Sequence, residues 1–294
     1  MVEHILTPEA KASIGVQLTL LAPPCEFEEV LNGVRCLTGD DPSTNRALAA
    51  AAAQYNRDQF VPVTLPNAKH PSLLSVYGDL GGGRFLCPRM HVSFHFDHLK
   101  HIVSDVESLP PDDADGGDVS AETWRHALES AMTSYILEHF PNGTVAVYAP
   151  ACKDTDRRLI VCIESHFSKY RSTGRWRSEW TITMPSGSSV KEFPVHGVIK
   201  VQTHMYEEGN VQLISSKEID FRTPAPDPQT FAHECVKSIK KQHIIYQTAV
   251  GDNLQNMSEA AFKVLRRRLP LTRSKIDWEK IITYQIGSEL TKVT

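Results

Sequence analysis

The sequence lacks the features of a membrane-spanning protein, a secreted protein or a disulfide scaffold. No stretch approaches the roughly 20 apolar residues of a membrane helix, and the opening MVEHILTPEAK carries acids and a proline where a secretory signal has a basic start and an apolar run. The six cysteines lie far apart and include no CxxC pair, which argues against a zinc cluster as well as a disulfide framework. We therefore expect a cytoplasmic protein with reduced cysteines.

The chain also lacks a strong net charge. Its formal charge is -4 over 294 residues, so the molecule as a whole has no bulk attraction to nucleic acid or anionic membrane. It contains no recognisable helix-turn-helix, zinc finger or aromatic RNA-binding motif, and we expect no nucleic-acid partner. With 41% hydrophobic and 22% charged residues, the composition is that of a globular protein with one large domain or two modest ones.

Catalytic and metal-binding patterns are missing as well. Gly81-Gly82-Gly83 is followed by Arg-Phe-Leu where a phosphate loop would have Gly-Lys-Ser/Thr, so it predicts a tight turn between strands. The alternation in HVSFHF (91–96) predicts a strand with His91 and His95 on one face, and no cysteine or carboxylate set accompanies these histidines and His98. We predict no catalytic residues, no metal, no cofactor and no enzymatic activity.

The first half of the chain predicts helices followed by short strands. Turn signals at Pro23-Pro24 and at 40–43 separate helices within the first sixty residues, and β-prone runs with Pro and Gly occupy 60–96. Residues 104–118 are acidic and rich in Pro and Gly, which predicts a solvated connection. A helix follows at about 121–140.

The second half predicts an antiparallel sheet and then a long helix. The predicted strands are joined by connections short enough for antiparallel neighbours, apart from a surface loop at 184–194. Their ranges are 144–149, 158–165, 175–183, 197–206 and 210–216. A seam of apolar, small and polar residues then repeats every three to four positions from Phe231 to about Asn256. It predicts a helix about 40 Å long that crosses the sheet and packs on the sheet and on a partner helix together.

One predicted strand has two contrasting faces, because successive side chains alternate. The faces carry Arg175, Arg177 and Glu179 on one side and Trp176, Ser178 and Trp180 on the other. We expect the charged face to be outside and the tryptophans to pack under a helix.

The fold class is therefore α+β, with no internal repeat. We divide the chain into four segments. These are an N-terminal helical cap or stalk (1–60), a short-strand region with an acidic loop (61–118), a helix, sheet and long helix (119–257), and a C-terminal segment (258–294).

The C-terminal segment carries the most informative charge pattern. Between Lys263 and Lys280 seven basic residues face two acidic ones, a balance of 7 − 2 = +5, which leaves −4 − 5 = −9 for the rest of the chain. Apolar residues lie between these charges, as in protein interfaces, and Pro270 divides the segment into two short helical elements. From its charge alone, the C-terminal segment could be a protein interface, a nucleic-acid contact or a solvated terminus.

Several longer strings, in order along the chain, resemble the F-actin-capping protein alpha subunit family. The most specific are GRWRSEW (174–180), EEGNVQL (207–213) and the C-terminal pattern FKxLRRxLPxTRxKIDW (262–278). The others are AQYNRDQF (53–60), GDLGGGRFLCPR (78–89), SFHFDHLK (93–100) and CIESHFSK (162–169).

The resemblance implies one half of a mushroom-shaped heterodimer with a beta subunit, joined through a continuous antiparallel sheet and two long helices. It implies calcium-independent capping of the barbed end of actin filaments, which blocks subunit addition and loss, by a mobile C-terminal tentacle. The family's actin-contacting basic positions fall on Lys263, Arg267 and Arg273. Arg266 lies beside them, and Trp278 and Ile282 fall in the apolar part of the tentacle; with Lys275, these residues complete the expected actin-binding set. The alternative is a structural capping subunit on the actin-related filament of dynactin. Phosphoinositides and capping-protein-interaction peptides are the further partners that the resemblance suggests.

Overall fold

The computed structural model describes residues 7–39, 41–109, 119–150, 157–169, 172–185, 192–205 and 211–256. The chain divides into two compact units, residues 1–238 and 239–294, with the boundary inside the last described helix. The four segments expected from the sequence stay a prediction. No helix in the described ranges is long and apolar enough to span a membrane.

The described chain begins with three helices, as the turn signals predicted. They are α1 (Pro8–Leu20), α2 (Phe27–Thr38) and α3 (Pro42–Asp58). Proline occupies the first turn of α1 and of α3, where its missing N–H costs nothing. The Asp41 carboxylate caps α3 by accepting from the backbone N–H groups of Ser43 and Thr44 at 3.1 and 3.0 Å. Apolar faces of these helices form a shared core that includes Phe27, Leu31 and Leu48.

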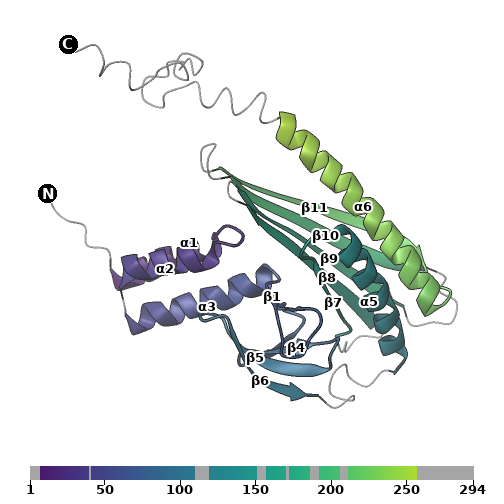
Figure 1. Cartoon of the computed structure of the whole chain (residues 1–294), viewed down its shortest axis with the longest axis horizontal. Coiled ribbons are helices and arrows are strands. Elements are labelled where there is room, and N and C mark those ends of the chain that lie inside the picture. Colours follow the sequence, from purple (N-terminus) through teal and green to yellow (C-terminus); the bar gives the residue numbers. More distant parts are fainter. Residues whose placement is uncertain are drawn as a thin grey trace, which may run out of the picture. The chain divides into compact units, whose positions relative to one another are not determined.

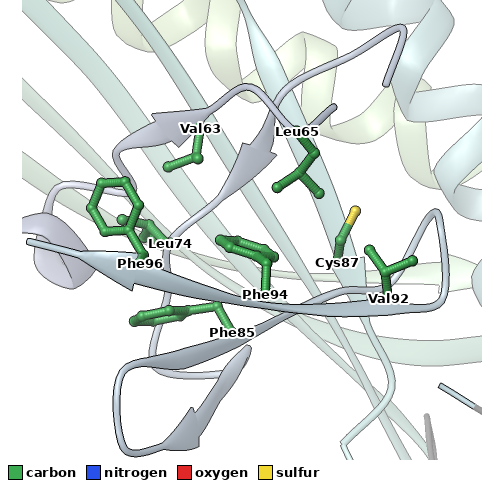
Figure 2. Close-up of a cluster of buried hydrophobic side chains, with 8 residues drawn as sticks. All are labelled: Val63, Leu65, Leu74, Phe85, Cys87, Val92, Phe94 and Phe96. Atoms are coloured by element: carbon green, nitrogen blue, oxygen red, sulfur yellow. The ribbon is translucent and has the colours of Figure 1, made fainter. Parts of the chain in front are cut away.

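Two small sheets follow α3. One pairs β1 (Pro62–Val63) with β2 (Ser72–Leu73), and the other has the order β3 (Asp79–Gly81), β4 (Arg84–Cys87), β5 (Val92–Asp97) and β6 (Ile102–Ser108). Phe85, Phe94 and Phe96 anchor the hydrophobic cluster of this region, which Figure 2 shows between the strands. Gly81, Gly82 and Gly83 all have positive φ, which confirms the tight turn between β3 and β4.

The five-stranded antiparallel sheet has the order β11-β10-β9-β8-β7, so each strand neighbours the next in sequence (Figure 1). The strands are β7 (Thr144–Tyr148), β8 (Arg157–Lys169), β9 (Ser172–Met184), β10 (Glu192–Met205) and β11 (Val211–Pro224). Short connections between consecutive strands favour this meander. The predicted α+β fold with a five-stranded antiparallel sheet is thus confirmed.

Helices cover one face of this sheet. α5 (Val119–His139) lies along β7, and its Trp124 ring centroid lies 5.2 Å from that of Phe193 on β10. Phe231 lies at the start of α6 (Pro228–Asn256). Its ring centroid is 5.4 Å from that of Trp124 and 5.3 Å from that of Phe193. Trp180 is fully buried and Trp176 lies 5.9 Å from Phe140, at the end of α5, so the tryptophan face packs inward as expected.

Several boundaries differ from the sequence expectation: β8 continues to Lys169 and β9 begins at Ser172, because these two strands pair along their whole lengths. The predicted connection at 104–118 was wrong at its start, because β6 extends to Ser108 and Arg84 pairs with Glu107 at 2.8 Å. The predicted loop at 184–194 was too long, because Phe193 is buried among aromatic rings and β10 therefore begins at Glu192. β11 continues to Pro224, well beyond residue 216, because its whole length pairs with β10.

The expected placement of His91 was also wrong. His91 precedes β5 and has φ 49°, so it does not share a strand face with His95. His91 lies 3.8 Å from Glu122, whereas His95 lies 3.5 Å from the Ser104 hydroxyl and His98 lies 3.1 Å from the Asn56 amide. No metal-binding group of three or more ligands occurs among the residues with described positions.

Candidate functional site

The site residues predicted from the sequence all belong to the C-terminal segment, which lies outside the described residues. They are Lys263, Arg266, Arg267, Arg273, Lys275, Trp278 and Ile282. Their role therefore stays a prediction, and the described chain supplies other candidate surfaces.

The first candidate is the outer edge of β11. Among the described strands, β11 pairs with β10 alone, and this pairing extends over the whole 14-residue length of β11. An edge strand of this length presents unpaired backbone donors and acceptors that can accept a strand from another chain. β11 is therefore a candidate subunit interface.

The opposite edge of the sheet is less accessible to another chain. β7 has five residues, all of them buried, and it contacts β2 of the same chain. The Tyr148 hydroxyl donates to the carbonyl of Leu73 at 3.1 Å. Strand addition is therefore favoured at β11.

Side chains of β11 support an interface on the sheet face opposite to α5. Ile214, opposite Gln202 of β10, is 62% exposed. Charged side chains of both signs follow it along the strand and can select a partner strand by charge. Those that share the face of Ile214 are Glu218, Asp220 and Arg222.

The second candidate is α6, whose residues from Ile239 onward belong to the second compact unit. Within α6, Phe231, Cys235, Ile239 and Tyr246 are buried, as their helical spacing predicted. Ile244 and Ile245 are 50% and 44% exposed, a pair that the predicted seam did not include. Two adjacent exposed isoleucines on a helix are a candidate contact for a partner helix.

The charged face of β9 is not the outside face that the sequence suggested. Arg175 is buried, and its Nε lies 3.0 Å from the Glu164 carboxylate, which is fully buried. An Nη1 N–H of Arg177 donates to the backbone carbonyl of Asp58, at the end of α3. This prediction was wrong because α3, more than 100 residues earlier in the chain, ends against this face.

Further polar contacts join the N-terminal helices to the same face. Glu26, just before α2, accepts from the Thr173 hydroxyl at 3.2 Å and lies 2.9 Å from His204 Nδ1. Gln59 lies 3.5 Å from Arg175. The arrangement is a charged junction between the N-terminal helices and the sheet.

A second buried charge network lies between α5 and the sheet. Arg125 is 1% exposed, and it pairs with Glu122 at 2.5 Å and with Glu129 at 2.8 Å. Arg89 adds a contact of 3.3 Å to Glu129, and Arg125 also donates to the Val147 carbonyl at 3.3 Å. Burial by itself lowers the pKa of Arg125, but the hydrogen bonds and negative charges of Glu122 and Glu129 outweigh it and raise that pKa above the ordinary arginine value. Helical spacing could have indicated the pairs within α5, but not their burial.

Comparisons with known proteins agree on one family. The family model described as F-actin capping protein alpha subunit matches residues 16–289. The F-actin-capping protein subunit alpha of Caenorhabditis elegans is 40% identical over 284 residues, covering 95% of this chain and 97% of that protein. The protein of the same name from Dictyostelium discoideum is 32% identical over 283 residues, with the same two coverages.

A solved structure has the same fold. It is the homodimeric actin capping protein alpha subunit from Plasmodium berghei, with a TM-score of 0.70 and 17% sequence identity. The match covers 83% of this chain and 92% of that chain.

Proposed function

The chain belongs to the F-actin capping protein alpha subunit family, and we propose that it caps the barbed end of actin filaments as one subunit of a heterodimer with a beta subunit. In this proposal capping needs no calcium, blocks both addition and loss of actin subunits, and takes place in the actin cytoskeleton. It involves no catalytic step.

The observation that carries the proposal is the extent of the family match, which includes the basic C-terminal segment. The match runs to residue 289 and therefore contains all seven predicted site residues. A local charge of +5 on an otherwise acidic chain favours binding to an acidic protein surface without making the whole molecule adhesive. Several charge-assisted contacts, each of about 1.5–3 kcal/mol, would add up at such a surface.

The filament end can be tested directly by elongation from actin filament seeds. Substoichiometric protein, together with the beta subunit, should stop elongation at the barbed end with or without calcium. Reversing the charges of Lys263, Arg267 and Arg273 to glutamate should restore normal elongation. A control variant reverses Arg46, Lys69 and Lys100, all exposed cations far from the segment in sequence, and should still cap. Undiminished capping by the first variant would refute the assignment of the C-terminal residues.

For assembly with the beta subunit, we propose that the outer edge of β11 continues the sheet into the partner. The unpaired edge and the exposed Ile214 support this arrangement. Ile214→Lys should weaken copurification of the two subunits, because a desolvated lysine at the contact is unfavourable. Leu80→Lys, at a residue 52% exposed on β3, is the matched control and should leave copurification unchanged. Equal recovery of both variants with the beta subunit would contradict this arrangement.

A further inference from the structure

A cationic hollow of about 480 Å³ lies where the end of α3 meets strands β9 and β10. Three cations line it: Arg57 from α3, Arg177 from β9 and Lys200 from β10. Phe60 and Val76 supply apolar wall. We call this feature the Arg177 hollow. It belongs entirely to the first compact unit and is separate in sequence from the C-terminal segment.

The strand register puts two of these cations directly opposite each other. Lys200 pairs with Arg177 across β10 and β9, and its neighbour on β11 is the uncharged Ser216. Side chains directly opposite on antiparallel strands have Cβ atoms about 4.5–5.5 Å apart, and like charges in that position are destabilising. The pairing of Lys200 with Arg177 therefore does not stabilise the sheet, and binding of an anion is a role that would account for it.

No carboxylate of the described residues forms a direct ion pair with either cation, although Asp58 and Glu164 lie close enough to offset part of the charge of Arg177. Arg57 has its own partner, Asp79, at 2.5 Å. Glu164, which faces Arg177 across β8 and β9, pairs with Arg175 at 3.0 Å. Within the described chain, no carboxylate lies within 4.0 Å of the Arg177 or Lys200 nitrogens.

Two carboxylates do line the hollow, and both must be counted. Glu179 accepts a hydrogen bond from the Tyr77 hydroxyl at 2.5 Å, and the Asp58 side chain is reached by the Gln54 amide at 3.5 Å. The wall therefore has three cations and two carboxylates, a balance of 3 − 2 = +1. Arg57 is paired with Asp79, so the lining cations without a direct ion pair to a described carboxylate are Arg177 and Lys200.

The guanidinium of Arg177 has free donors. One Nη1 N–H is used by the Asp58 carbonyl, while Nε has no hydrogen-bond partner among the described residues and is shielded from water. A buried donor without a partner is costly. The Nε–H and Nη2–H edge of arginine is the geometry that binds two oxygens of a phosphate or carboxylate, so a small rotation of the side chain would give an anion both donors. Burial and the neighbouring Arg175 lower the pKa of Arg177 to about 10, which still leaves it charged at neutral pH.

We propose that the Arg177 hollow binds the phosphate group of a small soluble molecule. Arg177 and Lys200 hold the phosphate oxygens, and Phe60 and Val76 contact the apolar part of the ligand. A phosphate presents three acceptor oxygens to Arg177 and Lys200, whereas a carboxylate presents two. The volume of about 480 Å³ fits a small soluble molecule, and the test below separates it from a lipid headgroup with the same phosphate chemistry.

The test uses the full-length protein in its native assembly, with Lys263, Arg267 and Arg273 changed to glutamate so that the C-terminal segment contributes no anion binding. Pyrophosphate is titrated by calorimetry at fixed low salt. Saturable binding is expected, weakened at least tenfold by Lys200→Met and unchanged by Lys100→Met, a control at an exposed lysine outside the hollow.

A second measurement separates binding from folding. Without pyrophosphate, Lys200→Met should raise the unfolding temperature, because it removes the like-charge pair. With pyrophosphate, the parent should gain more thermal stability than the variant. Absence of saturable binding at millimolar pyrophosphate, or equal binding by the parent and Lys200→Met, would overturn the proposal. Binding only to vesicles that contain phosphoinositide would also overturn it, by assigning the phosphate to a lipid. These outcomes are independent of capping, which the elongation assay measures separately.

Discussion

Glu26 Oε1 lies 2.9 Å from His204 Nδ1, joining the residue before α2 to strand β10 across 178 positions of sequence. The same oxygen accepts from the Thr173 hydroxyl of β9 at 3.2 Å. Both the Glu26 and His204 side chains are largely buried, with 16% and 9% exposure. One carboxylate therefore attaches the N-terminal helices to two strands of the sheet.

Glu26→Ala should lower the free energy of unfolding by about 1.5–3 kcal/mol, the usual range for hydrogen bonds to a charged group. Urea denaturation measures this loss. A double-mutant cycle with Thr173→Val should give a coupling of about 0.5 kcal/mol or more, since the two side chains are in contact. Glu138→Ala, at a residue 76% exposed on α5, is the control and should stay within about 0.5 kcal/mol of the parent. Additive effects of Glu26→Ala and Thr173→Val would contradict a shared contact.

Arg125→Met should destabilise the protein by about 3–5 kcal/mol, because it leaves the buried Glu129 without its closest cation. Thermal and urea unfolding both report this change. Lys237→Met removes a different ion pair, with Glu234 at 3.3 Å, but Lys237 is 68% exposed and the loss should stay below about 1 kcal/mol. Similar losses in the two variants would show that burial of the Arg125 network does not determine its contribution.

Gly197→Ala should destabilise the sheet by about 1–3 kcal/mol or more through overpacking. A Cβ at residue 197 would lie 2.0 Å from Cε3 of Trp180, which is fully buried and sits directly opposite on β9. Chemical denaturation measures the loss, and Trp180→Phe in the same chain should recover part of it.

The matched control for that substitution is Gly33→Ala in α2, where nothing lies within 4 Å of the added Cβ. It should stabilise the helix by about 0.5–1 kcal/mol, because alanine favours helix more than glycine does. Effects of the same sign at both glycines would contradict the packing argument.

The stability of the protein should fall as the pH decreases from about 6.5 to about 4, in part because of His98. Burial and the nearby Arg57 lower the pKa of His98 from 6.5 to about 4. In this window the unfolded state binds a proton at His98 that the native state does not bind, so the free energy of unfolding rises as the pH increases from about 4 and levels off above about 6.5. His101, also shifted downward by burial, adds to the same trend, while Asp79 and Asp97 oppose the shift of His98.

Urea denaturation at several pH values, with His98→Asn beside the parent, measures this dependence. Asparagine retains a polar group near the Asn56 amide, which lies 3.1 Å from His98 Nδ1. The variant should show a smaller slope between pH 4 and 6.5. His101, His70 and the buried His243, whose pKa burial lowers to about 3, contribute to the slope that remains. An identical slope in both proteins would exclude His98 as a contributor.

Local periodicity was enough to predict the elements of the fold. Alternating side chains with short connections predicted the five strands and their antiparallel order, and the three- to four-residue spacing from Phe231 predicted α6. Proline and aspartate near residues 40–43 predicted the start of α3. These signals act between residues close in sequence, so no tertiary contact is needed to recognise them.

Element ends depended on distant partners. β10 begins at Glu192 because Phe193 packs between Trp124 and Phe231, and β6 continues to Ser108 because β5 pairs with it. Neither neighbour is visible in the local composition, which in both segments is typical of a loop.

The sequence by itself determined the family of this chain, its α+β elements and the basic C-terminal segment, because each is written in consecutive residues. Tertiary structure decided that Arg175 on the charged face of β9 is buried, that Arg177 donates to the end of α3, and that Lys200 lies opposite Arg177 without a direct carboxylate partner among the described residues. Alternation predicts which residues share a face, but burial and charge balance depend on what the rest of the chain places against that face.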